Sequence, residues 1–299
     1  MRAAVRARSE PEPAGSPYLV LGLAVLFVSV GSILVRWAQA PALSVAFYRI
    51  FLAALFLAPF AARPAARSWP SLRARERALL VASGLALGVH FATWIASLSY
   101  TSVAASVLLV NTAPLFTLGF TRVFLRETIA PVVVGATGIA LAGAGLIAAG
   151  DWTGSASSLR GALLALAGAV TLSLYHVIGR GLRAALPLPA YVLAVWSIAA
   201  AALALIAAAA GAPFTGHPPR TLAAVVALAV VPTLAGHGLV NRSLRSLSAP
   251  TVGLFLLGEP LCAAAFAYLA FGETPGPLIV AGGALVLAAL ALVVARGSR

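Results

Sequence analysis

A carboxylate stands beside a predicted helix break inside a long apolar segment. Glu259 lies in the sequence Leu-Gly-Glu-Pro (257–260), near the middle of an apolar stretch that runs from 250 to 271. A charged side chain at the centre of a membrane helix costs about 3 kcal/mol or more, so its presence there indicates a function. Pro260 removes one helical hydrogen bond, so Gly258 and Pro260 predict a hinge next to a ligand or proton site at Glu259.

A second break is predicted at the matching place in the first half of the chain. The sequence Asn-Thr-Ala-Pro (111–114) stands there, and Pro114 precedes Pro260 by 146 residues. Two broken helices that face each other are typical of binding sites near the membrane midplane of transporters, so Asn111 joins Glu259 as a candidate. The open alternative is that both prolines only curve their helices for packing and that Glu259 pairs with a neighbour.

Two further apolar stretches carry polar groups and rings on one helical face. Spacings of three or four residues relate His90, Trp94 and Ser97 in 78–98, and Thr233, His237 and Asn241 in 220–240. Imidazole and amide groups hydrogen-bond a polar solute and aromatic rings stack on it, so both faces are candidate linings of a cavity. The open alternative is that these groups join helices by hydrogen bonds inside the membrane.

Arg49 falls well inside a predicted membrane segment. It lies about 10 Å into the stretch 42–61 at about 1.5 Å per residue. Three interpretations stay open: the guanidinium binds a substrate carboxylate, it pairs with Glu259, or it bends back to the membrane surface.

The composition places these residues in a membrane. Of 299 residues, 62% are hydrophobic and 9% are charged, whereas soluble domains carry roughly a quarter charged residues. A bilayer core about 30 Å thick needs about 20 apolar residues in a helix. The predicted fold is therefore an all-α polytopic membrane protein with ten transmembrane helices. The predicted spans are 18–37, 42–61, 78–98, 102–121, 130–149, 160–180, 190–210, 220–240, 250–271 and 277–295.

The positions of the arginines predict the orientation. With the N-terminus in the cytoplasm, 16 of the 20 arginines lie in cytoplasmic segments, as the positive-inside rule requires. Both termini are then cytoplasmic, and the number of spans is even. Because the arginines flank apolar segments and form no basic patch with interleaved aromatic residues, nucleic-acid binding is excluded.

An internal repeat divides the chain into two halves. Residues of the fourth and fifth spans recur 146 residues later in the ninth and tenth, and earlier positions recur at an offset of 144. Five spans per repeat make the second copy enter the membrane from the opposite side, which gives two inverted-topology five-helix repeats. The predicted organisation is a tail at 1–17, a first repeat at 18–150, an external linker at 151–159 and a second repeat at 160–296.

Segments 43–58, 97–131 and 243–277 resemble the drug/metabolite transporter superfamily, EamA type. The resemblance rests on SLSYTSVAASVLLVNTAPLF with LRET in the first half, and on SLRSLSAPTVGLFLLGEP with FGET in the second. It implies a ten-helix carrier in the bacterial inner membrane with both termini cytoplasmic, and export of amino acids, related metabolites or amphipathic drugs. Tyr48, next to Arg49 in one of these segments, is a further candidate, and the second half has no arginine equivalent to Arg49.

The leading hypothesis is a secondary transporter that exports a small metabolite by rocking one repeat against the other. The alternative is a membrane-embedded enzyme or lipid-handling protein that uses the same cavity, but no nucleophile and base stand at a known catalytic spacing. A channel would need a ring of like residues along a pore. No catalytic residue, cofactor or metal site is therefore predicted.

The expected partners are a small-molecule substrate and the lipid bilayer. Small residues at 136, 140 and 144 predict close packing against a neighbouring helix, in the same chain or in a homodimer. The candidate cavity residues are Glu259, Asn111, His90, Trp94, His237, Arg49, Asn241 and Tyr48, and the candidate hinge residues are Pro114, Pro260 and Gly258.

Overall fold

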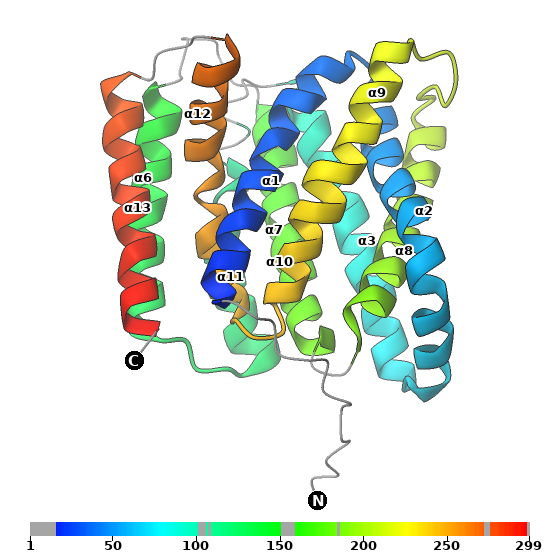
Figure 1. The fold of residues 1–299 in the computed structure, drawn as a ribbon, viewed down its shortest axis with the longest axis horizontal. Helices are drawn as coiled ribbons and strands as arrows, with labels where there is room; N and C mark the ends of the chain where they lie inside the picture. The colour runs from blue at the N-terminus through cyan, green and yellow to red at the C-terminus, as the bar shows by residue number, and fades with distance from the viewer. Residues whose placement is uncertain are drawn as a thin grey trace, which may run out of the picture.

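The computed structural model describes residues 16–100, 106, 109–150, 159–183, 186–271 and 276–297. Within these ranges every regular element is a helix, and the helices stand side by side in one bundle (Figure 1). The elements are α1 (Pro17–Ala38), α2 (Ala42–Ser68), η1 (Trp69–Ser71), α3 (Ala74–Ser97), α5 (Ala113–Phe120), η2 (Thr121–Leu125), α6 (Pro131–Gly150), α7 (Leu159–Arg183), α8 (Leu188–Ala209), α9 (Pro219–Leu228), η3 (Ala229–His237), α10 (Gly238–Ser243), α11 (Ala249–Leu256), α12 (Glu259–Phe271) and α13 (Pro277–Gly297).

The predicted all-helical membrane fold is confirmed. Six helical segments in the described part of the chain are long and apolar enough to cross a bilayer: α1, α2, α3, α7, α8 and the continuous unit of α9, η3 and α10. The other four predicted spans fall on α5 with the residues before it, on α6, on α11 with α12, and on α13. Most of the predicted tail and nearly all of the predicted linker lie outside the described residues, so those domain limits stay predictions.

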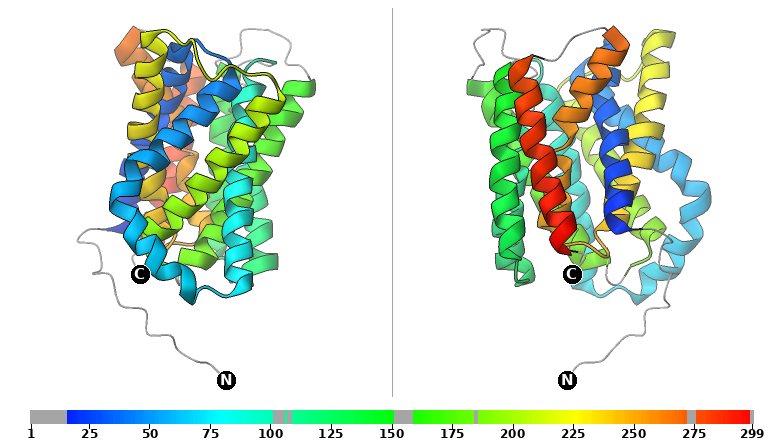
Figure 2. Two further views of the ribbon diagram at one scale, coloured as in Figure 1. Left: turned by 90° about the vertical axis from the view of Figure 1, so that its right-hand side faces the viewer. Right: turned by 60° about the vertical axis from the view of Figure 1, so that its left-hand side comes forward.

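Helix contacts follow the inverted repeat. The repeat relates α1 to α7, α2 to α8, α3 to the unit of α9, η3 and α10, α5 to α11 with α12, and α6 to α13. When each helix is exchanged for its equivalent, the contacts are kept. The contact of α3 with α7 corresponds to that of η3 with α1, and the contact of α5 with α7 corresponds to that of α12 with α1. α2 and α8 pack on each other, as do α6 and α13. α1 begins at the end of the bundle where α13 finishes, whereas α7 begins at the opposite end (Figures 1 and 2).

The small-residue stripe of α6 packs within the chain. Ala136 and Ala140 are fully buried, and they share a core cluster with Ala289 and Val293 of α13. Figures 1 and 2 show α6 and α13 side by side along their length. Gly143 permits the closest approach, because a Cβ atom there would lie 2.6 Å from the carbonyl oxygen of Gly282 in α13.

Gly143→Ala should therefore destabilise the pairing of α6 with α13. The added methyl group meets backbone, which cannot move aside as a flexible side chain does, and overpacking of this kind costs about 1–3 kcal/mol. Gly135→Ala in the same helix is the matched control, because nothing lies within 4 Å of its added Cβ. Thermal unfolding of the purified protein in detergent checks this, and equal melting temperatures for the two variants would contradict the packing.

Candidate functional site

Both predicted helix breaks are present. α11 ends at Leu256 and α12 begins at Glu259, with the amide of Gly258 donating to the carbonyl oxygen of Phe255 at 2.9 Å. In the first repeat, α5 begins at Ala113 directly after the turn at 111–112. Each proline is the second residue of the new helix, a position where its missing amide costs nothing. The prolines therefore restart a helix after a two-residue gap.

The two helix breaks lie next to each other inside the bundle. A Cβ atom on Gly253 of α11 would lie 3.6 Å from Cγ of Pro114, so the two broken segments are in contact. Ser173 of α7 donates to the carbonyl oxygen of Ala113 at 2.7 Å. A side chain of the second repeat thus satisfies the backbone beside the break in the first repeat.

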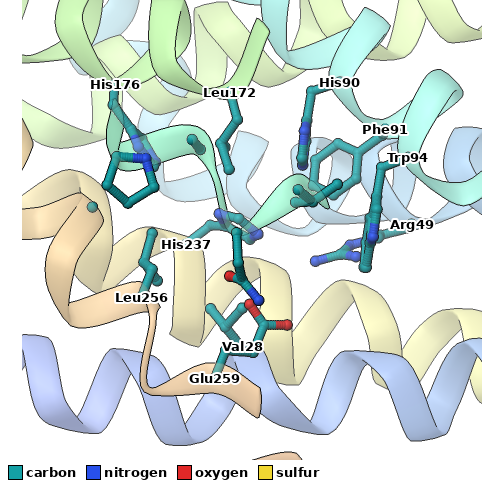
Figure 3. Close-up of a pocket in the computed structure, with 15 residues that line it drawn as sticks. Val28, Arg49, His90, Phe91, Trp94, Leu172, His176, His237, Leu256 and Glu259 are labelled. Carbon is teal, nitrogen blue, oxygen red and sulfur yellow. The ribbon is translucent and has the colours of Figure 1, made fainter. Parts of the chain in front are cut away.

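A small cavity of about 50 Å³ lies at this junction (Figure 3). A volume of this size holds a few water molecules at most, so in this form the cavity has no room for a larger solute. Six of the eight candidate cavity residues and the hinge residue Pro114 line it. The lining consists of Val28, Arg49, His90, Phe91, Trp94, Val110, Asn111, Ala113, Pro114, Leu172, His176, His237, Gly253, Leu256 and Glu259.

The cavity lies on the axis that relates the two repeats. Val28 matches Leu172 at the offset of 144, and both line the cavity. The pairs Val110 with Leu256, Ala113 with Glu259, and Phe91 with His237 match at the offset of 146, and all six of these residues line it too. Phe91 and His237 also touch, with ring centroids 5.6 Å apart. Equivalent residues meet only near the axis, so both repeats contribute to the cavity.

Arg49 projects into the cavity from α2. Its side chain is 1% exposed, so it does not bend back to the membrane surface. Nε donates to Oγ1 of Thr233 at 2.9 Å, and the guanidinium carbon lies 4.4 Å from the centroid of the Phe91 ring. Nη1 is buried and has no hydrogen-bond partner among the described residues. The guanidinium is thus held on one edge and unsatisfied on another.

A π-helix supplies the residue that holds Arg49. η3 covers Ala229–His237, and its wider turn lets the Thr233 hydroxyl donate to the carbonyl oxygen of Leu228, five residues earlier, at 2.7 Å. Because that hydroxyl donates to its own helix, its oxygen is left to accept from Arg49. π-helices are rare and frequent at functional sites. The equivalent helix α3 is a regular α-helix, so the repeats differ here.

Glu259 is the first residue of α12 and faces the same space as Arg49 (Figure 3). Within the described part of the chain its carboxylate has no hydrogen-bond or ion-pair partner, and it forms no ion pair within 4.0 Å with Arg49. Among the described residues Glu259 therefore makes neither a direct ion pair with Arg49 nor a hydrogen bond to another neighbour. A cation and a carboxylate stand in one cavity without neutralising each other directly.

Aromatic rings form the wall between these charges and α7. The His90 and Trp94 rings are stacked at a centroid distance of 5.9 Å and an interplanar angle of 7°. His90 is fixed by its Nδ1, which lies 2.9 Å from the carbonyl oxygen of Gly168 in α7. The predicted face of α3 thus lines the cavity, and His90 both lines it and joins two helices.

Two candidate residues lie apart from the cavity. The Asn241 amide group donates to the hydroxyl of Tyr175 and, at 2.8 Å, to the carbonyl oxygen of His237. The Tyr48 hydroxyl donates to the carbonyl oxygen of Phe214 in the loop between α8 and α9. The structure therefore brings together Glu259, Asn111, His90, Trp94, His237 and Arg49, and it separates Asn241 and Tyr48 from them.

Several lining residues were not predicted. Phe91, Val28, Leu172 and Leu256 are apolar and carry no chemical signal, but the offsets of 144 and 146 relate each of them to another lining residue. His176 differs from these, because it is a weaker candidate from its place inside the predicted span 160–180; it faces the cavity from α7, and neither of its ring nitrogens has a hydrogen-bond partner among the described residues. At the breaks the repeat points only to Leu256, through its match with Val110, and the other three apolar residues lie in helices away from the breaks.

Arg49→Met should leave the protein as stable as the native chain or more stable. The native guanidinium leaves Nη1 buried and unsatisfied, a cost of about 1–3 kcal/mol, and Thr233 keeps its bond to Leu228 without it. Denaturant unfolding in detergent checks this, with Arg242→Met at an exposed position as the control. A loss of about 3–5 kcal/mol, as for breaking a buried ion pair, would contradict the description of Arg49.

The arrangement of the chain has counterparts among known proteins. A curated relative from Streptantibioticus cattleyicolor, described as a probable terminal-alkyne amino-acid exporter, is 29% identical over 236 residues, which cover 77% of this chain and 75% of the relative. A crystal structure described only as that of a protein aligns with a TM-score of 0.76 over 95% of this chain and 98% of its own, at 19% identity, a likeness of fold alone. The model of the EamA-like transporter family matches twice, over residues 15–149 and 159–295. These two matches cover most of the sequence, and the protein therefore belongs to the EamA-like transporter family.

Proposed function

We propose that the protein is a secondary transporter that exports a small metabolite, an amino acid or a related amphipathic compound, across the bacterial inner membrane. The observation that carries the proposal is the cavity between the inverted repeats, which is lined by one carboxylate and by a cation whose Nη1 has no partner among the described residues. Ionisable side chains in a membrane mark substrate pathways. The relative described as a probable amino-acid exporter supports the direction and the class of cargo.

Separate contacts join the helices at the two ends of the bundle. At the end where α7 finishes, Arg180 pairs with Glu127 at 3.3 Å and donates to the carbonyl oxygens of Leu244 at 3.1 Å and Arg245 at 2.8 Å. This guanidinium ties the end of α7 to the segment after η2 and to the turn before α11. Its partly exposed position makes the ion pair weak, as a contact that opens in each cycle must be.

At the opposite end the loop between α8 and α9 is fastened to the start of α2. Ser44 donates to the carbonyl oxygen of Pro213 at 2.8 Å, and the rings of Phe47 and Phe214 meet edge to face at 5.2 Å. In the proposed cycle the two sets of contacts open in turn, so that the cavity faces one side of the membrane at a time.

The proposed orientation places both termini in the cytoplasm, following the arginine distribution. Ser71 and Thr215 are exposed. Ser71 ends η1, directly after α2, and Thr215 lies in the loop between α8 and α9, and these two segments lie at opposite ends of the bundle (Figure 1). In a variant whose single cysteine is removed by Cys262→Ser, Ser71→Cys should react with a membrane-impermeant thiol reagent only after cells are opened, and Thr215→Cys should react in intact cells. The reverse pattern would overturn the orientation.

Export is tested by comparing metabolites inside cells and in their medium for cells that express the native protein, cells that express Glu259→Gln, and cells with an empty vector. We expect at least one amino acid or related solute to accumulate in the medium only with the native protein, because Glu259 lines the cavity. Glu76→Gln, at a half-buried carboxylate outside the cavity, is the matched control and should export normally, because glutamine can also accept the capping bond from the Arg73 amide. Depletion from the medium would indicate uptake, and no difference in either compartment with folded protein in the membrane would favour lipid-phase chemistry.

A further inference from the structure

Each of the two charged groups of the cavity has atoms without a partner among the described residues. Nη1 of Arg49 is buried and unpartnered on a side chain that is 1% exposed, and the Glu259 carboxylate has no partner within the described part of the chain. Figure 3 shows the ends of both side chains directed toward the same space. A neutral solute there would leave both groups unsatisfied, and an anion or a cation would satisfy only one of them.

We propose that the cavity binds the zwitterionic headgroup of an α-amino acid, with the carboxylate on Nη1 of Arg49 and the ammonium group on Glu259. This inference rests on the proposed transport function and adds which atoms of the cargo meet which residues. A planar guanidinium is the side chain best suited to a carboxylate, and hydrogen bonds between charged groups are stronger than those between neutral groups. One headgroup placed between the two residues satisfies both.

The surroundings fix the remaining part of the cargo. The side chain of the bound amino acid meets the stacked rings of His90 and Trp94 or the apolar residues Val28 and Leu172, which line the same cavity. These walls favour apolar and aromatic amino acids over those with a third charge, because nothing in the described lining beyond Arg49 and Glu259 offers an opposite formal charge.

Thr233 is the positioning residue for the carboxylate. It holds Nε of Arg49 at 2.9 Å, which leaves the opposite edge of the guanidinium for the cargo. Thr233→Val removes the hydroxyl and should raise the KM of transport several-fold with little change in kcat, whereas Thr233→Ser should restore the native KM. Thr137→Val, which removes a hydroxyl that bonds only within α6, is the matched control.

The test measures thermal stabilisation of the purified protein in detergent by added ligands. The probes are the standard amino acids, L-propargylglycine as a terminal-alkyne amino acid, its carboxamide and its N-acetyl derivative. We expect one or more free amino acids to stabilise the native protein, and both derivatives to bind about 10- to 100-fold more weakly, the loss expected for one charged hydrogen bond.

The variants separate the two ends of the headgroup. Arg49→Met should weaken the free amino acid but leave the carboxamide as it was, and Glu259→Gln should weaken the free amino acid but leave the N-acetyl derivative as it was. Arg242→Gln and Glu76→Gln, at positions outside the cavity lining, should change nothing.

Three results would overturn the inference: derivatives that bind like their parent, variants that weaken every ligand equally, or no stabilisation by any amino acid. If the metabolite comparison still shows export of another solute, transport stands and only the zwitterion site fails. If that comparison shows no transported solute either, the proposed function fails with it.

Discussion

The incomplete satisfaction of one buried guanidinium is the constraint on which the site depends. A membrane interior has no water to solvate Arg49, so the chain must provide its partners or leave the cost in place. It provides Thr233 for Nε and the face of the Phe91 ring, and among the described residues it leaves Nη1 without a partner. An arginine whose donors were all bonded within the protein would only join helices. An arginine with an unbonded buried donor gains a hydrogen bond when a ligand binds.

The inverted repeat explains where this arginine is placed and how both sides of the membrane can reach it. Pairs of equivalent residues, such as Val28 with Leu172 and Ala113 with Glu259, meet around one cavity. Symmetry alone would make the cavity neutral or equally charged on both sides. The charged residues break this symmetry. Arg49 has no equivalent arginine in α8, and the residue equivalent to Glu259 in the first repeat is an alanine. The scaffold is therefore shared by the repeats, while recognition is divided between them.

Most of the fold followed from simple patterns in the sequence. Apolar run length and the prolines at 114 and 260 predicted the helices and both breaks, because a membrane helix must satisfy its own backbone. The depth of Arg49 in its span indicated a buried cation but left its partner open. That partner depends on the π-helix at Ala229–His237, and one extra residue in a helical turn leaves no signal in hydrophobic spacing.

Sequence spacing also could not show that two of the predicted cavity residues lie outside the cavity. Asn241 and His237 share a helical face by spacing, yet the amide bonds to Tyr175 and only the ring reaches the cavity. Tyr48 adjoins Arg49 in sequence, but neighbours on a helix point in directions about 100° apart, and the Tyr48 hydroxyl reaches Phe214 instead. Which polar group turns to a partner and which to the cavity is decided by tertiary contacts.

Access to the cavity from the two sides of the membrane tests the central claim most directly. Val110 lines the cavity, and Val110→Cys in the Cys262→Ser background gives it a single reporter thiol. Its reaction with an impermeant thiol reagent is measured in right-side-out and inside-out membrane vesicles. Thr215→Cys, on the side expected to react in intact cells, is the control that shows which membrane face is exposed. The account predicts reaction from both sides, slowed from each side by a bound amino acid. Reaction from one side only, or from neither while Thr215→Cys reacts normally, would contradict alternating access.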